Sequence, residues 1–177
     1  MYPECDFSLI KTQQFSDYCN DQLIDFIESY YYTSDKDSTF HKNDWGADYP
    51  PFIQLKERLE NTINDKIEQI WFERYEWDRI FHPHHHMNYT KLKDHPLKSI
   101  LSKHFTCGIL CINSLGDTNF YNASNNKRHK VQSVENLLIT FPSYIIHYVS
   151  PHLQKDAIRY TVAFNCKQHY DGASEIQ

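Results

Sequence analysis

The stretch from Leu137 to Asn165 reads LLITFPSYIIHYVSPHLQKDAIRYTVAFN. It contains three short runs rich in isoleucine, valine, tyrosine and phenylalanine, which are residues that favour β-strands. The runs LLITF, YIIHYV and AIRYTVAFN are separated by Pro-Ser and by SPHLQKD, and both separators have the composition of turns. The stretch therefore predicts three consecutive short strands.

Two further strand-like runs precede this stretch, HFTCGILCIN at 104–113 and TNFYN at 118–122. The N-terminal part of the chain has a helical pattern instead. The run DQLIDFIESYYY at 21–32 fits a helix, and residues 52–70 place apolar side chains at steps of three and four, the last of them Ile63, Ile67 and Ile70. Two prolines at 50–51 stand where this second helix is expected to begin.

Helices followed by many short strands indicate a mainly β protein with N-terminal helices, an α+β arrangement with the helices on one side of a β-sandwich or barrel. The chain has 177 residues, of which 40% are hydrophobic, which is enough for one core. We predict a single domain over 1–177, with helical support over about residues 1–75 and the β core over about 76–167.

Composition disfavours several classes of protein. The formal net charge is −5 and no strong cluster of lysine or arginine stands out, so the sequence has no strong nucleic-acid signature. No apolar run is long enough to span a bilayer. The five cysteines form no CxxC pair and no cationic, apolar leader begins the chain, so we expect a soluble, reduced protein of the cytoplasm.

The stretch Phe81–Asn88, FHPHHHMN, holds four histidines in five positions. In an extended segment, residues two apart point to the same side, so His84 and His86 face together while His85 faces away. Neutral imidazole binds iron, copper, nickel or zinc. A wet surface loop is the alternative, and a metal site needs a further ligand from another strand.

His147, in the middle of the apolar run YIIHYV, is the candidate for that ligand. Its alternative is a core histidine bonded to a backbone carbonyl. On the next predicted strand, Arg159 and Thr161 share one face, so a guanidinium and a hydroxyl point together and could grip a carboxylate. For Arg159 the alternative is an edge-strand arginine lying in solvent.

These residues form a pattern, Phe141-Pro142-Ser143, then His147, then Arg159-Tyr160-Thr161 and Phe164-Asn165. The pattern resembles the C-terminal motif of the 2-oxoglutarate- and iron(II)-dependent oxygenases, especially the small, prolyl-hydroxylase-like oxygenases of bacteria and their phages. Threonine at 161 in place of serine is the one change within the motif. The resemblance covers roughly residues 71–166 and is most specific in its C-terminal half.

The resemblance implies a double-stranded β-helix, or jelly roll, with one iron(II) at its mouth. His147 would be the distal histidine ligand, and Arg159 with Thr161 would bind the far carboxylate of the cosubstrate 2-oxoglutarate. The implied reaction uses O2 to hydroxylate an unidentified acceptor, a small molecule or a protein side chain, while 2-oxoglutarate is decarboxylated. A phage or virus origin would place the protein in the host cytoplasm.

The first metal motif departs from the family, which mostly has aspartate or glutamate two places after the first histidine. Here the candidates are His84-x-His86, which gives a three-histidine site of His84, His86 and His147, and His86-x-Asn88. We favour the first because an amide is a poor metal donor, and Asp94 remains a further candidate ligand. An all-histidine site carries one more positive charge than the usual one.

Two other functions stay open at this point. One is a cupin-like metal protein that does not use 2-oxoglutarate, and the other is a catalytically silent jelly roll that acts as a binding module. The segment 89–104 would lie over the mouth of the β-helix, where it is either a lid or an ordinary loop.

Overall fold

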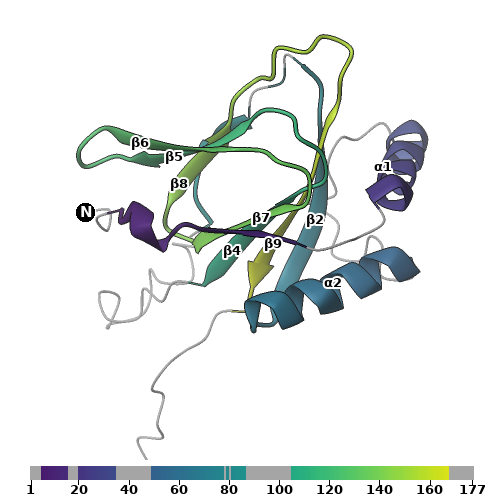
Figure 1. Ribbon diagram of the computed structural model, residues 1–177, viewed down its shortest axis with the longest axis horizontal. Helices are drawn as coiled ribbons and strands as arrows, with labels where there is room; N and C mark the ends of the chain where they lie inside the picture. The colour runs from purple at the N-terminus through teal and green to yellow at the C-terminus, as the bar shows by residue number, and fades with distance from the viewer. Residues whose placement is uncertain are drawn as a thin grey trace, which may run out of the picture.

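The computed structural model describes residues 5–15, 20–34, 49–77, 79, 81–86 and 105–167. Within these residues the chain forms two antiparallel sheets that face one another (Figure 1). The strands are β1 (Lys11–Gln14), β2 (Ile67–Tyr75), β3 (Phe81–His84), β4 (Thr106–Cys111), β5 (Asp117–Asn122), β6 (Lys127–Gln132), β7 (Leu137–Pro142), β8 (Ile146–Val149) and β9 (Arg159–Cys166).

The larger sheet has the strand order β1-β7-β4-β9-β2, and the smaller has the order β3-β8-β5-β6. Every pair is antiparallel. From β4 onward the chain passes back and forth between the two sheets, with β5, β6 and β8 in the smaller one and β7 and β9 in the larger one. This path makes a double-stranded β-helix, or jelly roll, so the predicted fold class is confirmed.

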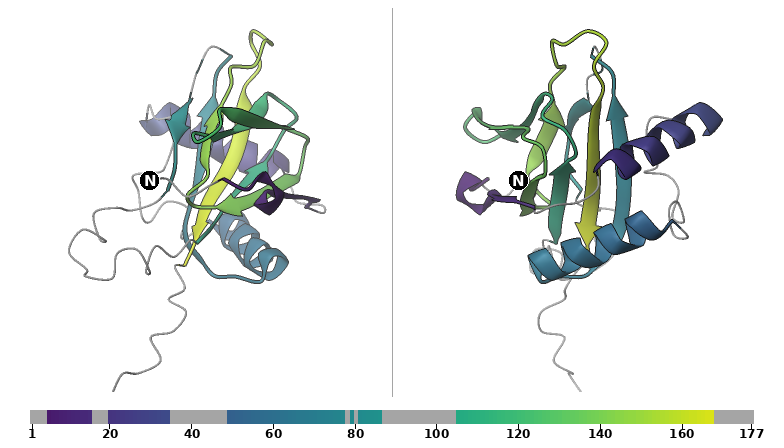
Figure 2. Two further views of the ribbon diagram at one scale, coloured as in Figure 1. Left: turned by 90° about the vertical axis from the view of Figure 1, so that its left-hand side faces the viewer. Right: turned by 45° about the vertical axis from the view of Figure 1, so that its right-hand side comes forward.

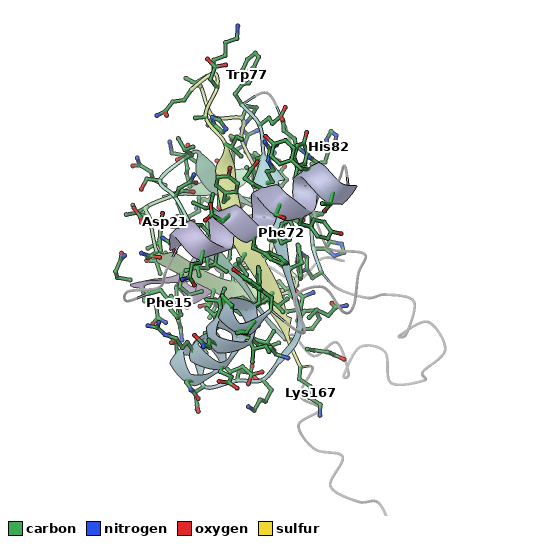
Figure 3. The ribbon with its side chains drawn as sticks, turned by 90° about the vertical axis from the view of Figure 1, so that its right-hand side faces the viewer. Phe15, Asp21, Phe72, Trp77, His82 and Lys167 are labelled. Atoms are coloured by element: carbon green, nitrogen blue, oxygen red, sulfur yellow. The ribbon has the colours of Figure 1, made fainter. Side chains whose placement is uncertain are left out.

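Helices α1 (Asn20–Ser34) and α2 (Pro50–Ile63) cover the outer face of the larger sheet (Figure 2). A short 3₁₀ helix, η1 (Phe7–Leu9), precedes β1. Figure 3 shows Phe72 of β2 beneath α1, and its ring packs edge-on against Tyr30, with ring centroids 5.2 Å apart. No helix among the described residues has the length and apolar character needed to cross a membrane.

Strand β9 separates two cores because its side chains alternate between its faces, as the sequence predicts. The outward residues Tyr160, Val162 and Phe164 pack against the helices. Phe164 lies over Gly108 of β4, where any Cβ would come within 2.0 Å of the ring, so the site accepts only glycine. The inward residues, which include Arg159, face the space between the sheets.

The two cores are separate clusters of buried apolar side chains. The outer core lies between the helices and the larger sheet and includes Leu23, Ile27, Leu55, Leu59, Phe72, Leu110, Val162 and Phe164. The inner core lies between the two sheets and includes Trp71, Cys107, Ile109, Cys111, Phe120, Ile139, Phe141 and Ala163. The inward polar side chains of the larger sheet therefore lie beside the inner core, between the two sheets.

The predicted helix over 52–70 is wrong beyond Ile63. Asn64 takes the left-handed conformation with φ 52°, and the next backbone N–H, of Asp65, closes on the Glu60 carbonyl. The chain then turns into β2, which pairs with β9 along its whole length. The helical spacing of the last isoleucines was coincidental, because pairing with a strand about 90 residues later decides their conformation.

The β structure also begins earlier than the predicted boundary near residue 75. Both β1 and β2 lie within the first 75 residues, and each forms an edge of the larger sheet. Strand β6, which is polar and exposed on most of its residues, was not predicted. The segment 89–104, with Asp94, and the neighbouring Asn88 lie outside the described residues.

Candidate metal centre and arginine pocket

Three histidines that are distant in the sequence converge between the sheets. His84 ends β3 and lies directly opposite His147 of β8 in the ladder, while His86 follows two residues after β3. One ring nitrogen from each lies within 4.8 Å of those of the other two. The structure thus brings together the three histidines that the sequence proposed, and His85 is not part of the group.

Two of these rings are oriented by backbone carbonyls. The Nδ1 atom of His84 lies 3.0 Å from the carbonyl oxygen of His82, and that of His147 lies 3.1 Å from the carbonyl oxygen of Ile145. Because a carbonyl oxygen only accepts, each Nδ1 is the protonated donor. Each Nε2 is therefore the unprotonated nitrogen, the form that a metal requires.

His86 is oriented by a side chain. Its Nδ1 lies 2.5 Å from Oδ1 of Asn165, and the Asn165 amide nitrogen donates to Oε1 of Gln69 at 3.0 Å, which fixes which way the amide faces. The Cys107 sulfur lies 3.2 Å from the same Oδ1 and 3.5 Å from the imidazole. Asn165 was recognised from the sequence only as part of a motif, and its contact with His86 was not foreseen.

The surroundings keep all three imidazoles neutral. Burial is the first cause in each case: it lowers the pKa of His84, lowers that of His86 to about 4, and holds that of His147 well below its ordinary value. Mutual repulsion among protonated rings acts in the same direction. Three uncharged Nε2 donors at neutral pH form a set that fits a divalent transition metal.

Arg159 is completely buried, so the alternative of an arginine in solvent is excluded. Its strand is flanked on both sides, by β4 and β2, rather than lying at an edge. One terminal nitrogen, Nη2, donates to Oγ1 of Thr118 at 3.1 Å, and the guanidinium lies 5.4 Å from the centre of the Tyr75 ring. Nε and Nη1 have no hydrogen-bond partner among the described residues.

A buried guanidinium with two unpaired nitrogens is costly unless a ligand completes it. Nε–H and an Nη–H together present the planar fork that fits a carboxylate. Thr161 lies on the same inward face, is 3% exposed, and hydrogen bonds to Tyr75. We call the group of Arg159, Thr118, Thr161 and Tyr75 the arginine pocket.

The arginine pocket lies close to the three histidines. Thr118, which binds the guanidinium, is two residues from Phe120 on β5, and Phe120 lies opposite His147 on β8. Two residues of an extended strand span about 7 Å. A short molecule that carries a carboxylate at each end could therefore contact the guanidinium and the histidine cluster together.

Three solved structures are similar to this chain over most of its length. A prolyl hydroxylase of Trichoplax adhaerens, in complex with a peptide fragment of the hypoxia inducible factor oxygen degradation domain, has a TM-score of 0.64 at 12% identity and covers 92% of this chain and 84% of its own. HygX of Streptomyces hygroscopicus, with nickel and 2-oxoglutarate bound, has a TM-score of 0.62 at 12% identity, covering 92% and 83%. A prolyl-4-hydroxylase of Pseudomonas putida has a TM-score of 0.56 at 14% identity, covering 91% and 89%.

No protein-family profile matches the sequence, and no curated protein matches it either. The likeness therefore lies in the path of the backbone. At identities of 12–14% it shows the fold. The chain has the double-stranded β-helix fold of the 2-oxoglutarate- and iron(II)-dependent oxygenases, as its C-terminal motif predicts.

Proposed function

We propose that this protein is a 2-oxoglutarate- and iron(II)-dependent oxygenase that hydroxylates an acceptor while 2-oxoglutarate is decarboxylated. The observation that carries the proposal is the pairing of two sites between the sheets. Thr118, which binds a buried arginine with two unpaired nitrogens, lies two residues along β5, about 7 Å, from the position opposite His147 of the three-histidine cluster. Either site alone would fit many activities.

The three histidines fit a divalent metal. One ring nitrogen from each lies within 4.8 Å of those of the other two, and the hydrogen bond at each Nδ1 fixes the ring orientation, as is usual for metal-bound imidazole. His84, His86 and His147 would hold iron(II), which supplies the activation of O2 when bound. The chain itself contributes the geometry, and the apolar wall of Phe120 and Phe141 beside His147 keeps water away.

The arginine pocket fits the far carboxylate of 2-oxoglutarate. In this assignment two parallel N–H groups of the Arg159 guanidinium donate to its two oxygens, while one N–H of Nη2 stays on Thr118. The Thr161 hydroxyl, on the same inward face of β9 as Arg159, adds a further donor. The keto-acid end of the molecule then points toward the three histidines, because β9 and β5 run from one site to the other.

The acceptor belongs to the proposal only as a class, a small molecule or a protein side chain. Two of the similar structures are prolyl hydroxylases, and one of these has a peptide fragment bound, which supports testing peptides. The activity would belong to the cytoplasm, where thiols such as Cys107 stay reduced.

An anaerobic titration tests the proposal. Iron(II) is added to the protein first and 2-oxoglutarate second, and the weak visible charge-transfer band of the metal-bound keto acid is followed. The band, and formation of succinate once air is admitted, are the expected results. Metal binding without the band would indicate the cupin-like alternative, and no metal binding would leave a silent binding module.

A further inference from the structure

Glu73 is the only aspartate or glutamate that is buried in the part of the chain the structure describes. Its residue exposure is 4%, and it lies in the middle of β2. A carboxylate is rarely buried unless a partner or a nearby positive charge compensates it. The helix predicted from the sequence ends at Ile70, and no sequence motif includes Glu73.

The ladder between β2 and β9 places Glu73 between the two sites. It lies opposite Thr161, and the next inward residue of β2, Tyr75, lies opposite Arg159. On its other side, the Trp71 indole N–H donates to Oε1 of Glu73 at 3.0 Å. The Trp71 ring in turn lies against His86, with centroids 5.8 Å apart.

The charges of the proposed complex explain why a carboxylate would be retained there. A divalent metal and the Arg159 guanidinium bring three positive charges, and 2-oxoglutarate brings two negative ones. Three neutral histidines add none, so one positive charge would stay uncompensated in a site whose histidines are partly or fully buried. A buried net charge is unfavourable. An ionised carboxylate at Glu73 would restore neutrality.

We infer that Glu73 supplies, from the neighbouring strand, the negative charge that the all-histidine ligand set lacks. The inference rests on the proposed function. In most relatives the carboxylate of the first metal motif performs this task as a ligand, whereas here it is displaced to β2 and acts through space. The competing explanation is that Glu73 only positions the Trp71 indole through their hydrogen bond.

Three variants separate the two explanations. Glu73→Gln removes the charge but keeps an oxygen that accepts from Trp71. Glu73→Asp keeps the charge but shortens the reach to the indole. Glu68→Gln, on the exposed end of the same strand, changes the net charge equally and is the matched control. Affinity for manganese(II) is measured by calorimetry, then affinity for 2-oxoglutarate at saturating metal, with thermal unfolding as a check on folding.

Charge compensation predicts that Glu73→Gln weakens manganese binding by about 10-fold or more, since a buried charge interacts strongly with a divalent cation. The affinity of the metal-loaded variant for the 2-oxoglutarate dianion stays the same or rises, because the repelling carboxylate is gone. Glu73→Asp stays closer to the wild type than Glu73→Gln does, and Glu68→Gln matches the wild type.

Other outcomes overturn the inference. Unchanged manganese affinity in Glu73→Gln removes the charge role, and a loss of both affinities, or a larger loss in Glu73→Asp, assigns Glu73 to holding Trp71. If Glu73→Gln does not fold, Glu73→Asp decides alone: metal affinity within about threefold of the wild type supports the inference and a larger loss rejects it. Failure of the wild type to bind manganese would instead refute the proposed function.

Discussion

His84 and His147 face each other across the β3–β8 ladder, with ring centroids 4.2 Å apart. Two imidazoles at directly opposed positions of an antiparallel pair need no loop to bring them together. The sheet pairing itself brings together two of the three proposed ligands, and only His86 reaches the cluster from beyond the end of a strand. Because the sheet itself holds these two positions opposite each other, single substitutions can test the site.

Removal of either opposed histidine is expected to abolish tight metal binding. His84→Ala and His147→Ala each leave two donors, so manganese(II) affinity should fall by more than about 100-fold, beyond the range typical of changes outside the ligand set. His85→Ala, one residue along and outside the cluster, is the matched control. Calorimetry on the three variants checks this, and tight binding by His147→Ala would disprove the assignment.

Arg159→Ala is expected to weaken 2-oxoglutarate binding by about 30-fold or more while metal affinity stays nearly unchanged. The physical reason is that truncation leaves a buried carboxylate without its charge-assisted partner, at a cost of roughly 2–5 kcal/mol. Arg159→Lys recovers only part of the loss, because a point charge does not reproduce the planar fork. Titration of 2-oxoglutarate into metal-loaded protein measures both, and equal affinities would reject the arginine pocket as its site.

When no ligand is present, Arg159 is expected to lower the free energy of unfolding of the protein. Arg159→Met removes a buried cation whose Nε and Nη1 are unpaired, so the free energy of unfolding of the metal-free protein is expected to stay the same or rise, by up to about 3 kcal/mol. Urea unfolding measures it. A large loss of stability in Arg159→Met would mean that the guanidinium has a structural function in the folded protein.

The metal-free protein should lose stability on mild acidification. Because burial lowers the pKa values of His84, His86 and His147 in the folded state, the unfolded chain binds more protons once the pH falls below about 6.5. Stability is therefore fully present above that pH and declines as the pH falls toward 4, the pKa region of His86. Urea unfolding between pH 7.5 and about 4.5 gives the slope.

Replacement of one of these groups provides the comparison for that slope. His147→Asn removes the most buried of the three, so its unfolding free energy should depend less steeply on pH than that of the wild type. Carboxylates elsewhere contribute equally to both proteins and cancel in the difference. Identical slopes would show that these imidazoles are not held neutral in the folded state.

Asn165 is expected to tune metal affinity although it does not bind the metal. Asn165→Ala removes the acceptor that orients His86, and a loss of about 10-fold in manganese(II) affinity is the expected result. Asn165→Asp keeps an acceptor and should retain tight binding. Asn119→Ala, a buried asparagine that donates to Ser150, is the control for general effects on the fold. Equal effects of both alanine variants would contradict the orienting role.

Much of the site was predictable because strand parity is a local property. The alternation along residues 159–165 indicates which side chains point inward, and the spacing of His84 and His86 does the same for the first motif. Glu73 was not predictable in the same way, because no strand pattern was recognised in residues 71–75, which were assigned to the helical part of the chain. The role of Asn165 was not predictable for a different reason: its partner, His86, lies 79 residues away in the sequence, and a local pattern does not show such a contact.

Strand β9 follows every other described strand in the sequence, yet it lies between β4 and β2 inside the larger sheet. During synthesis on the ribosome, β2 therefore has no neighbour with which to pair until Arg159–Cys166 has left the exit tunnel. Insertion of this one strand completes the outer core and also places Arg159 in the arginine pocket. A nascent chain that ends before β9 lacks both the complete larger sheet and the arginine that would bind a carboxylate. The fold and the proposed binding site are therefore completed at the same time.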